Sequence, residues 1–182
     1  EVAAVILEPV LGNCGVIVPE RGYLEAVREL TRKHNVVLIF DEVKVGLRLA
    51  PGGAAELFGV EPDIVCLAKV VGGGMQLGAF GVRPEICSVI APLGGTAHHG
   101  TYNGHPVSVA AGLAILTQVM TPDAYASINR LGERLRQGMR AVLDRQGIAG
   151  LVLGIGSMST ILFTGLERVR NYREAVQCDK EA

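Results

Sequence analysis

The chain has 182 residues, 49% of them hydrophobic and 4% aromatic, with 24 glycines and no tryptophan. This composition is typical of a compact α/β protein with tight turns, and it excludes a disordered, collagenous or coiled-coil chain. The net charge of −1, with lysine and arginine scattered singly, excludes the basic stripe of a nucleic-acid binder, and no apolar run reaches the roughly 18 residues of a membrane span.

The first half of the chain alternates apolar runs with one helical segment. We expect strands at residues 2–7, 36–40, 64–68 and 77–82, and a helix at residues 20–35. The run at 36–40 is β-branched and continuously apolar, as in a parallel strand that is covered on both faces. The connection from 64–68 to 77–82 is too short for a crossover helix, so the last strand should run antiparallel. The pattern predicts an α/β fold with a mostly parallel sheet and one antiparallel strand.

The second half of the chain begins with two helical segments. An Ala-rich stretch predicts a helix at residues 106–119, and a longer helix is expected at residues 122–146. Pro122 near the start of the longer helix and Gly147 after its end match the usual preferences at helix termini. These terminal residues favour a helix from about residue 122 to residue 146.

Beyond that helix the pattern changes to short strands at residues 152–153 and 159–163, which we assign to a different layer. We predict a division into residues 1–120, part of a large domain, and residues 121–182, a connecting helix and the start of a small α+β domain. The chain begins inside a strand pattern and ends in a polar helical stretch without a stop signal. We expect it to be a fragment of a longer gene product or the product of a partial reading frame.

The four cysteines do not form a CxxC pair. They are Cys14, Cys66, Cys87 and Cys178. Cys66 and Cys87 lie in apolar stretches, where we expect buried thiols. The spacing favours a reduced, cytoplasmic protein over a disulfide framework.

Two charged residues follow successive apolar strands, Asp41 after the second and Lys69 after the third. Ligands of open α/β sheets bind beyond the carboxyl ends of the strands, so these side chains should emerge at one edge. A lysine there is costly to bury unless it is paired or used covalently, and a desolvated lysine is a nucleophile toward carbonyl carbons. Such a pair suits pyridoxal phosphate (PLP), which needs a lysine for a Schiff base and an acid for its ring nitrogen. The spacing alone leaves a second interpretation open, in which Asp41 caps a turn and Lys69 is merely exposed.

Several motifs occur together in one order along residues 1–120. They are Glu8-Pro9-Val10, Gly12-Asn13, Leu38-Ile39-Phe40-Asp41-Glu42-Val43, Pro62-Asp63-Ile64, Lys69-Val70-Val71-Gly72-Gly73-Gly74, Gly78-Ala79-Phe80-Gly81, Gly100-Thr101 and Gly104-His105-Pro106. This series resembles the class III aminotransferase signature, in the variant of the glutamate-1-semialdehyde 2,1-aminomutase type. The resemblance implies the large domain of a fold type I, PLP-dependent transferase, and it becomes sparse after residue 120.

The resemblance assigns the chemistry to three residues. Lys69 would form the Schiff base with PLP and later move the substrate proton as general acid and base. Asp41 would pair with the pyridine nitrogen, and Val43 would pack on one face of the ring. In the segment after Lys69, three consecutive glycines would let the backbone approach a planar ligand closely.

The resemblance also implies residues at the margins of the cofactor pocket. Thr101 would bind the phosphate across a dimer interface, from the neighbouring subunit, so a homodimer is expected. Glu8 and Asn13 match family positions near the pocket. The expected small molecules are an amino donor and a keto or aldehyde acceptor, and no metal site is expected, because the adjacent His98 and His99 point to opposite sides of an extended segment.

The chain departs from the family pattern at three positions and lacks other parts. Gln76 replaces a usual proline, His105 replaces a usual asparagine, and Lys44 adds a charge beside Val43. No segment matches the family's Gly/Ser/Thr-rich phosphate loop, its ring-stacking aromatic residue or its carboxylate-binding arginine. Three functions stay open: an aminotransferase that uses Lys69, a glutamate-1-semialdehyde-type aminomutase, and an inactive truncated fragment.

Overall fold

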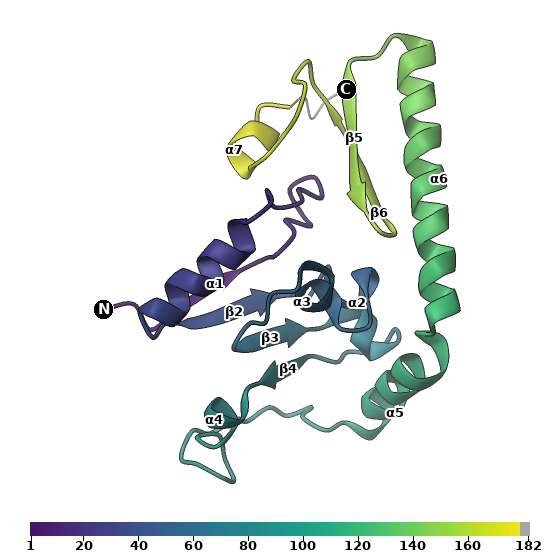
Figure 1. Cartoon of the computed structure of the whole chain (residues 1–182). Coiled ribbons are helices and arrows are strands. Elements are labelled where there is room, and N and C mark those ends of the chain that lie inside the picture. Colours follow the sequence, from purple (N-terminus) through teal and green to yellow (C-terminus); the bar gives the residue numbers. More distant parts are fainter. Residues whose placement is uncertain (179–182) are drawn as a thin grey trace.

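The computed structural model describes residues 1–178, which form a four-stranded mixed sheet, a separate two-stranded hairpin and one long helix that runs along the hairpin (Figure 1). The strands of the main sheet are β1 (Ala4–Leu7), β2 (Val37–Asp41), β3 (Ile64–Leu67) and β4 (Ala79–Val82), in that spatial order. β1, β2 and β3 are parallel, and β4 pairs antiparallel with β3. The predicted mostly parallel sheet with one reversed strand is confirmed.

The helices differ greatly in length. They are α1 (Tyr23–Lys33), α2 (Gly46–Leu49), α3 (Gly53–Phe58), the 3-10 turn η1 (Lys69–Gly72), α4 (Pro84–Cys87), α5 (Pro106–Ala114) with its π-helical extension η2 (Ile115–Val119), α6 (Pro122–Gln146) and α7 (Tyr172–Ala175). The predicted bounds of α6 are confirmed, and the helix predicted at 106–119 comprises α5 and η2. The single-turn helices α2 and α4 were not predicted, because four residues are too few to show a helical period. The helix α7 lies within the polar helical stretch expected at the end of the chain.

The long helix α6 is held by well-formed termini and by the hairpin that follows it. The Thr121 hydroxyl accepts a hydrogen bond from the Ala124 amide at 3.2 Å, and Gly147 ends the helix with a left-handed φ of 65°. The hairpin strands are β5 (Gly150–Ile155) and β6 (Met158–Phe163), a second sheet as expected. The division into domains near residue 121 stays a prediction.

Arg136 connects α6 to the turn of the hairpin. The buried guanidinium donates through Nη1 to the carbonyls of Gly156 at 2.8 Å and Met158 at 2.9 Å. A Cβ at Gly132 would lie 2.3 Å from the Gly156 carbonyl oxygen, so only glycine allows this approach. The hairpin turn therefore lies directly on the helix backbone.

The loop that follows β1 fills the space between the main sheet and the hairpin. Val10 and Val16 belong to a buried cluster that includes Met158 of β6. Ile17 belongs to a second cluster, together with Val169 and other C-terminal residues. The loop is thus part of the core that joins the two sheets, although it is not regular secondary structure.

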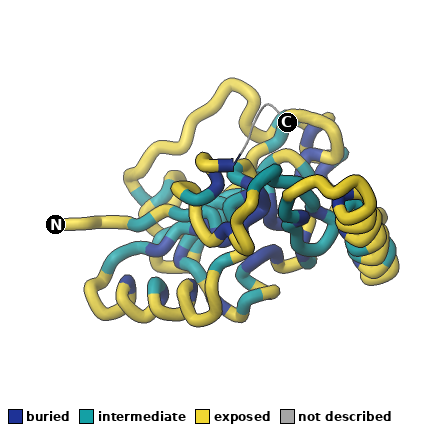
Figure 2. The backbone as a smooth tube through the Cα atoms, turned by 90° about the horizontal axis from the view of Figure 1, so that it is seen from above, coloured by how far each residue is buried: buried dark blue, intermediate teal, exposed yellow. Residues whose placement is uncertain are grey.

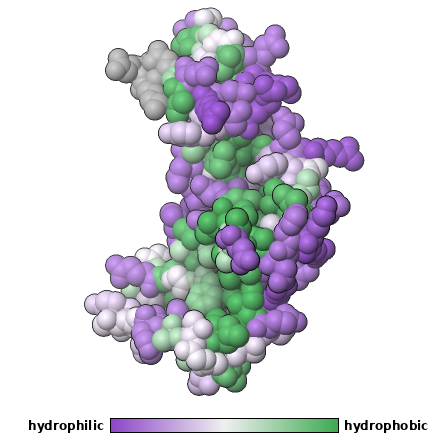
Figure 3. All heavy atoms as spheres, turned by 90° about the vertical axis from the view of Figure 1, so that its left-hand side faces the viewer, coloured by the Kyte–Doolittle hydropathy of each residue, from purple (hydrophilic) through white to green (hydrophobic). Residues whose placement is uncertain are grey.

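Many large apolar side chains are exposed to solvent. From above, the buried residues lie in the interior, and most of α6 is exposed (Figure 2). On another face, hydrophobic residues gather over the middle and lower parts of the molecule (Figure 3). Exposed apolar side chains on the outer strands, on α5 and on α6 include Ile6, Phe80, Val107, Val109, Leu113, Leu131, Leu135 and Val142. The hydrophobic surface that gathers on the face in Figure 3 is typical of faces that pack against other protein.

The cysteines are all free in residues 1–178. Cys66 is half-buried in β3, whereas Cys87 is exposed, so the expectation of a buried thiol is wrong for Cys87. Its apolar neighbourhood in the sequence forms the single-turn helix α4, none of whose residues is buried.

None of the described helices is, on its own, long and apolar enough to cross a membrane. The segment Pro106–Val119 and α6 meet the criteria of length and composition only as a pair, and the two are bent by 84°.

A buried ion pair ties α1 and the end of β4 to the middle of the sheet. Asp63 accepts a hydrogen bond from the Leu38 amide at 2.7 Å, and its carboxylate lies 3.0 Å from Arg28 Nη1 and 2.9 Å from Arg83 Nη1. Burial by itself would raise the pKa of Asp63, but the Leu38 amide and the two guanidinium groups lower it below its usual value. The carboxylate is therefore ionised and fully paired inside the fold.

We predict that Asp63→Asn destabilises the chain by about 3 kcal/mol at neutral pH, because it leaves the buried Arg28 without its counter-charge. Since folding lowers the pKa of Asp63, its stabilisation is present above the unfolded pKa of about 3.9 and is lost as the pH falls through the lower folded value. Chemical denaturation at several pH values measures both effects.

The matched control is Glu85→Gln, which removes only the exposed carboxylate 3.8 Å from Arg83. We expect little change there, because exposed pairs contribute little. Equal effects of the two substitutions would contradict the assignment of Asp63 as the buried anchor.

Candidate functional site

The parallel pairing of β2 with β3 brings the two predicted charged residues to one edge of the sheet. Asp41 is the register partner of Cys66, and the Glu42 amide donates to the Cys66 carbonyl at 3.0 Å, which extends the ladder by one residue. Lys69 follows Cys66 by three residues and begins η1. Asp41 and Lys69 therefore leave neighbouring strands at the same carboxyl edge.

Asp41 is held in a tight turn. Its Oδ1 accepts a hydrogen bond from the Val43 amide at 3.1 Å, so the half-buried carboxylate also shapes the backbone that carries Val43. Burial raises the pKa of the neighbouring Cys66 thiol, and the Asp41 carboxylate raises it further. This end of the β2–β3 pair thus combines a carboxylate with a protonated thiol.

Lys69 has a strained backbone and a free side chain. Its φ of 55° lies in the left-handed region that residues other than glycine and asparagine rarely occupy. The residue is exposed, so none of the residues that the structure describes buries its amine. Strained residues cluster at functional sites, and Lys69 is one of three such non-glycine residues in the part of the chain that the structure describes.

The glycines after Lys69 make room for a helix. A Cβ at Gly73 would lie 3.0 Å from the Ala111 carbonyl oxygen of α5, and a Cβ at Gly112 would lie 2.9 Å from the Val71 carbonyl oxygen. The close approach at Gly73 is therefore to α5, and the expected approach of the three glycines to a planar ligand stays a prediction. Gly73 and Gly112 thus let α5 pack closely against η1, and this packing fixes the segment that begins with Lys69.

Glu8 and Asn13, expected near the pocket, lie in one loop that Lys44 holds. Glu8 Oε2 accepts a hydrogen bond from the Gly12 amide at 3.1 Å. Lys44 Nζ donates to the Gly12 carbonyl at 2.7 Å and to Asn13 Oδ1 at 2.8 Å. The sequence marked Lys44 as a departure from the family pattern but did not identify its partners, which lie more than 30 residues away along the chain.

Glu42, next to Asp41, has a structural role that the sequence did not reveal. Its buried carboxylate accepts hydrogen bonds from the amides of Ala54 at 2.6 Å and Ala55 at 3.1 Å, at the start of α3. Burial raises the pKa of Glu42, and the two amides oppose this effect. The two adjacent acids therefore have different roles. Glu42 binds the amides at the start of a helix, and Asp41 lies at the sheet edge, where it can contact a ligand.

Thr101 is exposed in the loop before α5. It is on a different segment from the strand ends that carry Asp41 and Lys69. Its expected contact with a phosphate across a dimer interface stays a prediction, as do the roles expected for Val43, Glu8 and Asn13.

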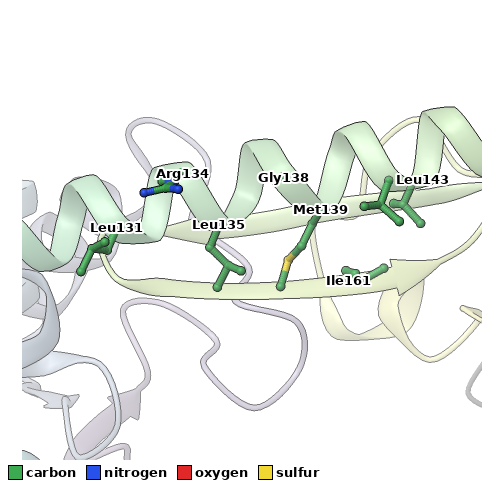
Figure 4. Close-up of a pocket in the computed structure, with 8 residues that line it drawn as sticks. Leu131, Arg134, Leu135, Gly138, Met139, Leu143 and Ile161 are labelled. Carbon is green, nitrogen blue, oxygen red and sulfur yellow. The ribbon is translucent and has the colours of Figure 1, made fainter.

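A separate groove lies along α6, away from these residues (Figure 4). It has a volume of about 540 Å³ and is lined by Leu131, Arg134, Leu135, Gly138, Met139, Val142, Leu143 and Ile161. Leu135 and Met139 point from α6 toward β6, and Ile161 lies on the strand below them. With Arg134 as its charged member, the groove suits the burial of apolar side chains and not reaction with a carbonyl compound.

The donor set at the sheet edge fits PLP at two points. The Lys69 amine is accessible for the aldehyde group, and the Asp41 carboxylate suits a protonated pyridine nitrogen. For the phosphate group, the sequence pattern offers the Thr101 hydroxyl. The described residues therefore fit the reactive part of the cofactor better than its phosphate.

Comparison with known proteins gives the same family as the motifs. Residues 1–180 match the family model described as Aminotransferase class-III. A protein named glutamate-1-semialdehyde 2,1-aminomutase from Methanosarcina acetivorans is 49% identical over 181 residues, which cover 100% of this chain and 42% of that protein. The chain thus spans about two fifths of the length of the curated relatives that it matches.

Solved structures share the fold. A β-phenylalanine aminotransferase from Variovorax paradoxus superposes with a TM-score of 0.90 at 37% identity, over 98% of this chain and 41% of that one. A glutamate-1-semialdehyde aminomutase from Pseudomonas aeruginosa PAO1, solved with PMP, has a TM-score of 0.84 at 30% identity, over 97% and 41% of the two chains. The fold is that of the PLP-dependent transaminases, and PLP is the cofactor of this family.

We predict that Lys69→Gly is more stable than Lys69→Ala by about 1 kcal/mol, because glycine adopts the left-handed conformation without the steric cost that alanine has. Thermal denaturation of the two variants measures the difference.

The matched control is the exposed Glu29 in the middle of α1, where the order should reverse because glycine destabilises a helix relative to alanine. If Lys69→Ala were the more stable of the Lys69 pair, the backbone at this position would not be strained.

Proposed function

We propose, because this chain belongs to the class-III aminotransferase family, that the protein carrying it moves an amino group between an amino donor and a keto acid or aldehyde, with PLP as cofactor. The observation that best supports this proposal is the arrangement of Asp41 and Lys69 at the ends of paired parallel strands. The strained backbone of Lys69 supports it independently.

Each residue at the sheet edge would have a separate task. Lys69 would hold PLP covalently through Nζ, and Asp41 would hold the ring nitrogen by an ion pair. Val43 would pack against the ring, and Thr101 would bind the phosphate from the partner subunit of a homodimer. PLP, when bound, supplies an electron sink for the bonds around the substrate's amino-bearing carbon.

Lys69 would also move the proton. Once the substrate's amino group has displaced it from PLP, the Nζ amine would accept the proton from the substrate carbon and return it at the position where the new C–H bond forms. Asp41 would take no part in these transfers, because its task is to pair with the ring nitrogen. This division requires Nζ to be accessible, and Lys69 is exposed in this chain.

The second candidate is an aminomutase that acts on an amino aldehyde. The specific observation in its favour is the identity of 49% with the Methanosarcina acetivorans protein of that name, against 37% with the β-phenylalanine aminotransferase. Against it, the solved aminomutase from Pseudomonas aeruginosa is 30% identical. Both candidates use the same lysine and the same acid, so they differ in substrate and not in the residues at the sheet edge.

A homodimer in the cytoplasm is the proposed setting. The exposed apolar side chains of α5 and α6 support an assembly with further protein, and the free cysteines support a reducing compartment. The alternative is that the 182 residues alone form an inactive fragment. It arises because they span about two fifths of the length of the related proteins.

We predict that incubation of the chain with PLP, followed by borohydride reduction, modifies Lys69 and leaves Lys33 and Lys44 unmodified. Lys33 is exposed at the end of α1, and Lys44 is engaged by two oxygen atoms, so the three lysines distinguish a specific site from general reactivity. Peptide mapping by mass spectrometry measures the modification.

Lys69→Ala is the control and should remove the label. Label spread evenly over the lysines, in this chain and in a protein that extends it, would contradict a site at Lys69. If Lys69 were labelled only in the longer protein, the proposed function would belong to that protein, and the 182-residue chain alone would be inactive.

We predict that the active protein requires a separate keto or aldehyde acceptor for turnover of an amino donor. An aminotransferase needs two substrates because the amino group leaves one molecule and enters another. Product formation from a single amino aldehyde, at a rate unaffected by added acceptor, would instead establish the aminomutase. Mass-spectrometric analysis of products with and without acceptor separates the two.

A further inference from the structure

Lys44 makes the connection that links the turn of Asp41 to the loop after β1. Its Nζ donates to the Gly12 carbonyl at 2.7 Å and to Asn13 Oδ1 at 2.8 Å. Both distances are those of charge-assisted hydrogen bonds, which are about twice as strong as neutral ones. β1 and β2 are parallel neighbours, so this bridge joins the two chain segments that leave the same edge of the sheet.

Gly12 is held from both sides. Its amide donates to Glu8 Oε2 at 3.1 Å, and its carbonyl accepts from Lys44. A Cβ at this position would lie 2.8 Å from Lys44 Cδ and 3.2 Å from Val45 Cγ1. Glycine at position 12 therefore leaves the space that the aliphatic part of Lys44 fills, and the two residues fit each other.

The other end of the same turn carries Asp41. The Val43 amide donates to Asp41 Oδ1 at 3.1 Å, so residues 41–44 form one short unit with the carboxylate at its start and the bound ammonium at its end. Val45, the next residue, is fully buried. A turn that is fixed at both ends holds its first side chain in one orientation.

We propose that Lys44 is a positioning residue that fastens the turn 41–44 to the loop 8–13 and thereby fixes the Asp41 carboxylate for the ring nitrogen of PLP. The link to the cofactor rests on the proposed function. The Lys44 side chain acts through Asp41 and would not itself touch the substrate.

The first test measures the connection without cofactor. In Lys44→Met, which keeps the length of the side chain but removes its charge, hydrogen exchange at the amides of Gly12 and Val43 should become about tenfold faster. Lys44→Arg should restore most of the protection, and Lys33→Met is the matched control without effect at these amides. Unchanged exchange in Lys44→Met would overturn the proposal.

A double-mutant cycle tests the fit of the two residues. Gly12→Ala displaces the Lys44 stem, so it should speed exchange at the Val43 amide by a similar factor. The double variant Gly12→Ala/Lys44→Met should show little more than either single change, because both remove the same contact. Fully additive effects would contradict a shared contact.

The second test uses PLP as the probe. The test is made in whichever form, this chain or a longer protein that contains it, is labelled by PLP at Lys69. There, Lys44→Met should raise the PLP concentration for half-maximal labelling about tenfold, as expected for loss of a hydrogen bond to a charged group. The substitution should also shift the pH dependence of the bound cofactor's visible absorption. Faster exchange with unchanged PLP affinity and an unchanged pH profile would make the connection purely structural and overturn the proposal. If no PLP labels Lys69 in the wild type, the proposed function fails, and the exchange measurement alone decides whether Lys44 fastens the turn.

Discussion

The parallel register of β1, β2 and β3 is the constraint on which the site depends. Parallel strands end at the same edge, so the residues that follow each strand meet there, however far apart they are in the sequence. Glu8 follows β1, Asp41 ends β2 and Lys69 follows β3. A slip of the β2–β3 register by one residue would turn Asp41 to the opposite face of the sheet, where it would no longer share a face with Cys66. Asp63 stabilises this register, because its carboxylate binds the Leu38 amide of β2 from the start of β3.

Glycine at three positions allows the surrounding elements to hold that edge in place. Gly73 and Gly112 let α5 approach the turn that begins with Lys69, and Gly12 makes space for Lys44. In each case a backbone carbonyl or an aliphatic side chain occupies the volume of a missing Cβ. The glycines therefore contribute rigidity by close packing, which is the opposite of the flexibility that a glycine-rich sequence suggests.

The sequence predicts the parts of the structure that local patterns encode. The strands follow from apolar runs, the reversed strand from the length of its connection, and the bounds of α6 from its terminal residues. The packing of Gly73 on α5 and the partners of Lys44 depend on residues more than 30 positions away, so no local pattern contains them. Cys87 shows the same limit, because an apolar neighbourhood in the sequence does not specify what covers it in space.

This chain determines the backbone conformation of Lys69 but not the desolvation of its amine. Its left-handed backbone is fixed locally, by β3 before it and by η1 and α5 after it. Desolvation, by contrast, requires atoms packed around the amine, and the side chain is exposed in these residues. Contacts within this chain thus set the backbone geometry of Lys69 but not the surroundings of its amine. Because the related proteins are more than twice as long, the residues that cover Lys69 would come from the rest of such a protein or from a second copy, and that cover would control the reactivity of the amine.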